Sequence, residues 1–206
     1  MELPTGSAMN HFRSLVRRAA ADERPDADLL IDAPHDEAAF AELVARHGPV
    51  VWGVCRHLLG EADAEDAFQA TFVALLRSRV RDPAALGAWL HRVAVRVALT
   101  ARREAARRRT REHAAARPEA APPPDEWADT MAAVHREVAA LPDADRAAFV
   151  LCVIEGRTQS DAAARLGRTP GAVAGLVARA KKRLVARLTA RGVAPGLAAL
   201  GAAAIP

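Results

Sequence analysis

The chain has 206 residues, 51% of them hydrophobic, with two cysteines and a formal net charge of +4. This length suits one or two small domains, and the apolar content excludes a chain that is disordered throughout. Because the apolar residues are mostly Ala, Leu and Val and no strand pattern is found, we predict an all-α fold.

Several classes of protein are disfavoured by what the sequence lacks. It has no CxxC pair, no HExxH motif and no His/Cys cluster with metal-ligand spacing, so neither a metal nor another cofactor is expected. The absence of a Gly-rich phosphate loop and of a nucleophile–base spacing argues against an enzyme with a small-molecule substrate. Neither a signal peptide nor an apolar run long enough for a membrane span is found, which predicts a cytoplasmic protein.

The first part of the chain is predicted to be mobile. Residues 1–34 carry several prolines among mixed charges and have no sustained hydrophobic period. A first helix should follow, Gly48–Pro49 should end it, and a second helix should run as far as Gly60. We interpret His47 and His57 as helix-end and surface residues, because neither has a second metal ligand one turn away.

The next predicted helix begins at an Asp63 cap and runs to Leu76. Its apolar side chains recur at helical spacing and should form a buried stripe (Ala67, Phe68, Thr71, Phe72, Leu75 and Leu76). That stripe leaves Asp66 and Gln69 facing solvent or a partner.

A long helix should open at Asp82–Pro83, after an irregular segment at 78–81. Its apolar face suits a core, and a second stripe at three- to four-residue spacing combines Trp89 with Arg92, Arg96 and Arg103. Aromatic and cationic side chains together favour binding of a DNA duplex or an unpaired strand. A packed tryptophan beside solvated arginines explains the same pattern and remains an alternative.

The remaining chain divides by composition. We predict a helical domain over 35–109, a flexible proline-bearing linker over 110–125, a second helical domain over 126–191 and an Ala/Gly-rich tail over 192–206. The basic charge concentrates in the linker and in the last helices, which indicates a polyanionic partner.

Within the second domain, 157–188 predicts a helix-turn-helix. Thr158 followed by Asp161 forms a capping box, Gly167 suits a left-handed helix end, and Thr169–Pro170 restarts a helix. The second helix should bury an apolar seam (Val173, Val177, Ala180, Leu184 and Leu188).

The second helix of such a motif enters the DNA major groove with its first residues near the bases. Its candidate DNA contacts are therefore at the helix start (Arg168, Thr169, Gly171 and Ala172) and along its cationic faces (Arg179, Lys181, Lys182 and Arg183). A small helical bundle with a charged last helix is the simpler alternative.

Five stretches in order resemble a bacterial extracytoplasmic-function sigma factor, the minimal two-domain specificity subunit of RNA polymerase. They are LVARHGPVVWGVCRHLLG (43–60), DAEDAFQATFVALL (63–76), GAWLHRVAVRVAL (87–99), LPDADRAAFVLCVIEGRTQSDAAARLG (141–167) and TPGAVAGLVARAKKRLVARL (169–188). The resemblance implies a transcription initiation factor that binds core RNA polymerase and promoter DNA, with an anti-sigma factor as a further candidate partner.

The resemblance also implies roles for particular residues. Asp66, Gln69 and Phe72 would contact core polymerase, Trp89, Arg92, Arg96 and Arg103 would lie on the minus-ten side, and the helix-turn-helix would read the minus-thirty-five element. Family members commonly place Thr, a basic or polar residue, and Arg where this chain has Ala172, Ala174 and Leu176. We therefore expect a largely sequence-independent grip from this helix.

Two other functions stay open on the sequence. An autonomous helix-turn-helix transcriptional regulator would bind a specific duplex tightly without polymerase. A helical protein-interaction adaptor, with basic faces that are merely solvated, would show negligible salt-dependent affinity for DNA.

Overall fold

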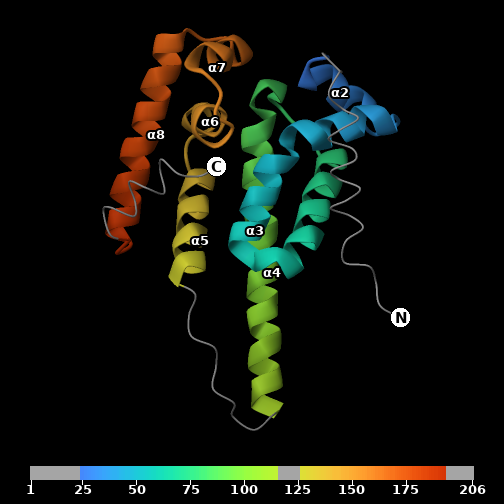
Figure 1. Ribbon diagram of the computed structural model, residues 1–206, viewed down its shortest axis with the longest axis vertical. Coiled ribbons are helices and arrows are strands. Elements are labelled where there is room, and N and C mark those ends of the chain that lie inside the picture. Colours follow the sequence, from blue (N-terminus) through green and yellow to red (C-terminus); the bar gives the residue numbers. More distant parts are fainter. Residues whose placement is uncertain (1–23, 116–125, 194–206) are drawn as a thin grey trace.

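The structure, a computed structural model, describes residues 24–115 and 126–193. These residues are helical and include no strand, which confirms the all-α prediction. The helices are α2 (Asp26–Asp32), α3 (Glu37–Leu76), η1 (Pro83–Ala85), α4 (Leu86–Ala115), α5 (Glu126–Ala139), α6 (Asp143–Phe149), η2 (Val150–Ile154), α7 (Gln159–Leu166) and α8 (Pro170–Ala190). In Figure 1, α3 and α4 stand in the middle, α5 to α8 lie on one side and α2 on the other. No described helix is both long and apolar enough to cross a membrane.

The first described helix, α2, starts at Asp26, within the leader predicted over 1–34. α2 packs on α3 with Leu29 fully buried, so the last part of the predicted leader belongs to the core. A single buried leucine in a short helix is too weak a pattern to be recognised in the sequence. Residues 1–23 of the predicted leader lie outside the described part of the chain.

α3 contains both predicted break points, but only one of them interrupts it. The helix continues through Pro49, where Val50 and Val51 are buried and their packing outweighs the hydrogen bond that the proline lacks. Gly60 has a φ of 74° and a ψ of −179°, and Figure 1 shows α3 bending sharply along its length. Because the helix already continues after Gly60, Asp63 lies within the first turn and does not cap it, contrary to the prediction.

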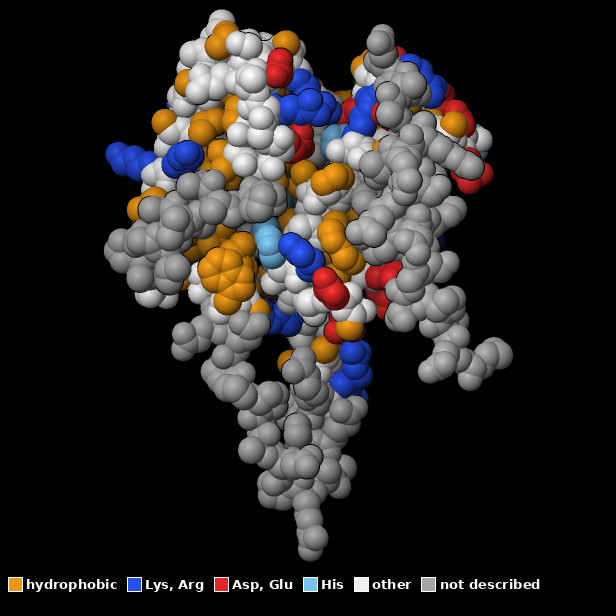
Figure 2. Space-filling model, in the orientation of Figure 1, with side chains coloured by type: hydrophobic (Ala, Val, Ile, Leu, Met, Phe, Trp, Pro, Cys, Tyr) orange, Lys and Arg blue, Asp and Glu red, His pale blue; other side chains and the backbone are white. Residues whose placement is uncertain are grey.

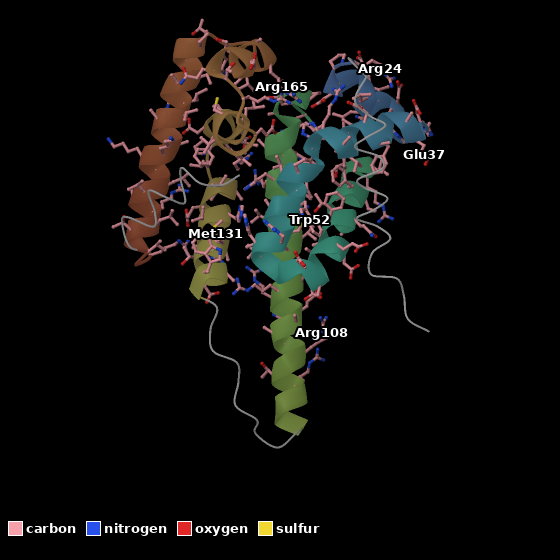
Figure 3. The ribbon with its side chains drawn as sticks, viewed as in Figure 1. Arg24, Glu37, Trp52, Arg108, Met131 and Arg165 are labelled. Carbon is pink, nitrogen blue, oxygen red and sulfur yellow. The ribbon has the colours of Figure 1, made fainter. Side chains whose placement is uncertain are left out.

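α4 begins as the sequence predicts and ends later. The Asp82 carboxylate accepts a hydrogen bond from the Ala84 amide at 3.1 Å, and Pro83 starts the short helix η1 that leads into α4. α4 then runs to Ala115, so the first residues of the predicted linker are helical. Its end projects beyond the other helices and carries Arg108 (Figure 3). The rest of the predicted linker, 116–125, is not among the described residues.

The helix-turn-helix is confirmed, together with its capping residues. The Thr158 hydroxyl accepts from the Asp161 amide at 3.1 Å, and Gly167 ends α7 with a φ of 61°, a region that costs glycine little. The Thr169 hydroxyl accepts from the Ala172 amide at 3.2 Å at the start of α8. The seam of α8 differs in one place, because Leu176 is buried in the core with Val173 and the expected Val177 is only partly buried.

The two halves of the chain pack against each other and share their cores. Ala132 of α5 joins the apolar cluster formed by α2, α3 and α4. In return, Val50 of α3 and Ala88 of α4 join the cluster formed by α5, α6, η2 and α8. The predicted boundary between two domains is therefore a packed interface in this structure.

Candidate nucleic-acid interface

The four candidate minus-ten residues line one groove. Trp89, Arg92, Arg96 and Arg103 project from α4 into a hollow of about 780 Å³. Arg79 and Arg136 complete it, and no acidic residue is among its lining. The groove is therefore a cationic surface with one aromatic ring, the chemistry that suits a nucleic-acid strand.

Burial of the opposite face of α4 fixes the direction of these side chains. Leu86, Leu90 and Ala94 are fully buried, and their spacing turns the stripe that starts at Trp89 outward. Trp89 is half-buried and the arginines after it are exposed. The closest acid to Arg92 is Asp143 of α6 at 3.7 Å, in a pair that is largely exposed and therefore weak.

A second hollow, of about 480 Å³, joins the groove to the helix-turn-helix. It shares Arg79, Trp89 and Arg92 with the first and adds Arg81 and Arg168. The structure thus brings Arg168, the predicted contact before α8, to the same cleft as Trp89. The sequence could not predict that Arg136 lines the groove or that Arg168 lies in one cleft with Trp89. Arg136 and Arg168 belong to the other half of the chain and reach α4 only in the folded protein.

The start of α8 is open to a partner. Arg168, Thr169, Gly171 and Ala172 are exposed, although the Thr169 hydroxyl is used as the helix cap. Leu176, one of the positions where family members place a polar contact, instead packs in the core of the motif.

The four predicted cations along α8 divide into two pairs. Lys181 and Lys182 are exposed, and the described residues offer them no salt bridge. Arg179 and Arg183 instead approach the buried carboxylate of Asp145 in α6, at 3.6 and 2.9 Å. These two arginines therefore hold α8 against α6, a role that the sequence pattern did not indicate.

The candidate polymerase face on α3 needs one correction. Asp66 and Gln69 are exposed as predicted, but Phe72 is only 3% exposed. Its ring lies edge-on to that of Phe40, with centroids 6.2 Å apart, and cannot reach a partner from this position. Val73 is 44% exposed instead, and Leu76 is 40% exposed, so the prediction that Leu76 belongs to the buried stripe is wrong. Val73 and Leu76 lie four and seven residues after Gln69 on the same helix face, so helical spacing could have identified both.

His47 is buried, contrary to the prediction that it lies at the surface. Its Nε2 donates to the Asp26 carboxylate at 2.8 Å, and Arg46 and Arg165 pair with the same carboxylate. Figure 3 labels Arg165 where α7 approaches the top of the central helices. Burial would raise the pKa of Asp26, but the hydrogen bond and charge of His47 and the charge of Arg165 lower it.

Histidine at the junction of the two halves does not form a metal centre. No group of three or more His, Cys, Asp or Glu residues in the described chain is placed to hold a metal ion. His57 and His91 each lie against His135.

Each half of the chain matches a known protein family. The family described as Sigma-70 region 2 matches residues 43–108, and the one described as Sigma-70, region 4 matches residues 131–184. The first match covers most of α3 and α4, and the second runs from within α5 through most of α8.

Two curated proteins are similar in sequence to most of the chain. The chain is 33% identical over 178 residues to the ECF RNA polymerase sigma factor SigE of Mycolicibacterium smegmatis, covering 77% of this chain and 66% of that protein, just under two thirds. It is 36% identical over 167 residues to the ECF RNA polymerase sigma factor SigM of Mycobacterium tuberculosis, covering 77% of this chain and 82% of that protein. The chain belongs to the extracytoplasmic-function sigma factors, the RNA polymerase sigma factors of this type that act in transcription initiation.

Proposed function

We propose that this chain binds core RNA polymerase through the second part of α3 and promoter DNA through α4 and the start of α8. The observation that carries the proposal is the acid-free groove lined by Trp89, Arg92, Arg96 and Arg103. A protein that acts with polymerase on chromosomal DNA works in the cytoplasm.

The groove suits an unpaired promoter strand better than a closed duplex. A base can stack on an aromatic ring such as that of Trp89, and such stacking contributes roughly 1–3 kcal/mol per base. Arginines one and two turns further along the same face, Arg92 and Arg96, would follow the phosphates. Each phosphate contact releases counterions, so the binding should depend on salt.

The start of α8 supplies a second DNA contact with less capacity to read bases. Arg168 suits a phosphate, which the positive end of the helix dipole also favours. The first turn adds little, because Pro170 has no N–H and the Ala172 and Val173 amides donate to Thr169. Ala172 offers only a methyl group, and Leu176 is committed to the core. This helix would mainly position the duplex, with Lys181 and Lys182 adding attraction that does not depend on sequence.

The proposed polymerase contact is the exposed face of α3 that contains Asp66, Gln69, Val73 and Leu76. Two polar groups beside two exposed apolar side chains, on one helix face, are typical of a protein–protein interface with an apolar centre and a polar rim. Phe72 supports this face from beneath, because it packs against Phe40 and Phe68.

In vitro transcription tests the proposal. Core polymerase supplemented with the chain should initiate at defined promoter positions, and Arg92→Ala/Arg96→Ala should lower the yield of transcripts without preventing the chain from binding core polymerase. Glu37→Ala, which removes an exposed charge at the start of α3 outside both hollows, is the control and should leave the yield unchanged.

Two results would reject the proposal in favour of the alternatives. Tight, specific duplex binding without polymerase, and no stimulation with it, would indicate an autonomous regulator. No binding to core polymerase and no salt-dependent affinity for DNA would indicate a protein-interaction adaptor.

A further inference from the structure

Three histidines from three helices meet where the two halves of the chain pack together. His57 of α3 and His91 of α4 belong to the first half, and His135 of α5 belongs to the second. His135 Nε2 lies 3.2 Å from His57 Nδ1, and His135 Nδ1 lies 3.2 Å from His91 Nε2. His91 and His135 are fully buried, and Figure 2 shows only small pale-blue patches of histidine surface between the two halves.

The arrangement is a chain of imidazoles with His135 in the centre. Its ring is stacked on that of His57, with centroids 5.5 Å apart, and tilted against that of His91 at 5.4 Å. A neutral imidazole carries one N–H donor and one acceptor nitrogen, so a neutral His135 can donate to one neighbour and accept from the other. Neutral rings therefore satisfy both contacts.

Within the described part of the chain, no carboxylate pairs with His91 or His135 to compensate a positive charge. The charges that act on the rings are cationic: Arg56 of α3 acts on His57, Arg146 of α6 acts on His91, and the outer rings act on His135. Arg146 is itself held by Asp143 at 2.6 Å. A protonated ring would thus be buried among like charges.

Among the described residues, two carboxylates come near this interface without contacting His91 or His135. Asp63 lines a small hollow together with His57, Arg56 and Arg102. Glu155, at the end of η2, packs against Gly87 of α4, where even a Cβ atom would come within 2.2 Å of its Oε1. Glu155 also lies near His47, in the separate cluster around Asp26 and Arg165.

The packed arrangement is unsuited to a promoter. Trp89 of the minus-ten groove and Arg168 of the helix-turn-helix line the same hollow of about 480 Å³. The minus-ten and minus-thirty-five elements are about 25 base pairs apart by their names, which is ~85 Å at ~3.4 Å per base pair. The two DNA contacts must therefore separate before the chain can span both elements, a step that rests on the proposed function.

We propose that His57, His91 and His135 form a pH-sensitive latch that holds the two halves closed when the rings are neutral and releases them when the rings are protonated. The latch keeps the minus-ten groove and the helix-turn-helix folded onto one another, so the closed chain is an inhibited form of the factor.

The direction of the pH effect follows from the ring environments. Burial, with a smaller effect of Arg146, lowers the pKa of His91 to about 3. Burial, with smaller effects of His91 and His57, holds the pKa of His135 well below its ordinary value of 6.5, and burial and Arg56 lower the pKa of His57. In the open form the rings regain water and their ordinary pKa, so the open form binds more protons.

The closed form is consequently fully stable above about pH 6.5 and loses stability as the pH falls below it. Each ring that stays unprotonated in the closed form shifts the equilibrium about tenfold between pH 7.5 and 5.5, so His91 and His135 together shift it about 100-fold towards the open form.

Small-angle X-ray scattering of the full chain tests the latch without polymerase or DNA. Between pH 7.5 and 5.5 the radius of gyration should rise reversibly while far-UV circular dichroism keeps its helical signal. His91→Gln/His135→Gln, which keeps hydrogen-bonding groups but cannot be protonated, should abolish this response. His35→Gln, at an exposed histidine outside the interface, should respond as the wild type does.

Three outcomes would overturn the latch: an unchanged radius in the wild type, expansion that parallels loss of helix, and a full response in the double variant. If the double variant does not fold, the wild-type measurement still tests the latch. His57→Gln, at the half-buried outer ring of the three histidines, gives a milder second variant. A chain that opens with pH but gives no transcription would reject the proposed function and leave the latch intact.

Discussion

Two arginine stripes that look alike in the sequence differ in the structure. On α4, Arg92, Arg96 and Arg103 line a groove without acids. On α8, arginines recur every four residues and face two buried carboxylates. Asp145 pairs with Arg179 and Arg183, and Glu137 pairs with Arg187 and Arg191.

The difference shows that spacing alone does not identify a DNA-binding arginine. A helical stripe of cations can face a polyanion or the acids of a neighbouring helix, and both keep the same three- to four-residue period. Which of the two applies depends on whether another helix places a carboxylate opposite. α5 and α6 place Glu137 and Asp145 opposite α8, whereas the exposed Asp143 is the one acid among the described residues that pairs with the stripe on α4.

The largest expected effect is on stability, at the centre of the α8 stripe. Asp145→Ala should lower the free energy of unfolding by about 2 kcal/mol, somewhat less than for a fully buried pair because Arg179 and Arg183 are half-exposed. Arg92→Ala, which removes the exposed pair with Asp143 at 3.7 Å, should cost less than about 1 kcal/mol. Urea denaturation followed by circular dichroism measures both, and equal losses would remove the distinction between the two stripes.

The next effect is on DNA binding and belongs to α4. Arg92→Ala/Arg96→Ala should weaken binding of a single-stranded promoter oligonucleotide to the polymerase-bound chain about 30-fold, from two contacts of about 1 kcal/mol each. The slope of log affinity against log salt should fall by about 1.4. Fluorescence anisotropy across a salt series gives both values.

The matched variant for that measurement is Arg179→Ala/Arg183→Ala. Because these arginines are engaged with Asp145, their loss should lower the melting temperature and leave the salt slope nearly unchanged. If the salt slope fell as much as in the α4 variant, Arg179 and Arg183 would have to release Asp145 and bind phosphate.

A smaller loss is expected from the aromatic ring of the groove. Trp89→Ala should reduce binding of the same oligonucleotide about tenfold, since one stacked base contributes roughly 1–3 kcal/mol. The salt slope should not change, because stacking releases no counterions. Trp127→Ala is the control, as Trp127 is exposed on α5 outside the groove, and an equal loss there would contradict the assignment of Trp89.

The smallest effect concerns the free cations of α8. Lys181→Ala/Lys182→Ala should weaken duplex binding about fivefold and lower the salt slope by about 1.8, equally for every sequence. Competition between promoter and scrambled duplexes measures the sequence dependence. A loss confined to the promoter duplex would indicate that these lysines read bases.

Much of the local structure could be predicted from the sequence. The capping pairs Thr158–Asp161 and Thr169–Ala172, the left-handed Gly167 and the cap at Asp82 depend on residues within one turn of each other. Such interactions are encoded in neighbouring positions, so they give the helix-turn-helix and the start of α4 directly. The stripe from Trp89 to Arg103 follows from helical periodicity in the same way.

Errors arose where a second element decides the environment. Helical spacing placed Phe72 in the buried stripe, and the packing of its ring against Phe40 excludes the polymerase contact that the resemblance implied. Likewise, His47 is buried because α2 brings Asp26 to it from 21 positions away.

The sequence by itself determined most of the helices, the caps at Asp82, Thr158 and Thr169, the two sigma-type regions and the order of the cationic stripes, because these depend on contacts within a few residues. Only the tertiary structure decided which arginines are paired, that the two halves share a core, and that His57, His91 and His135 meet. The arginine pairs of the α8 stripe join residues 34 to 54 positions apart and the histidine contacts join residues 44 and 78 positions apart, and neither composition nor periodicity records such contacts.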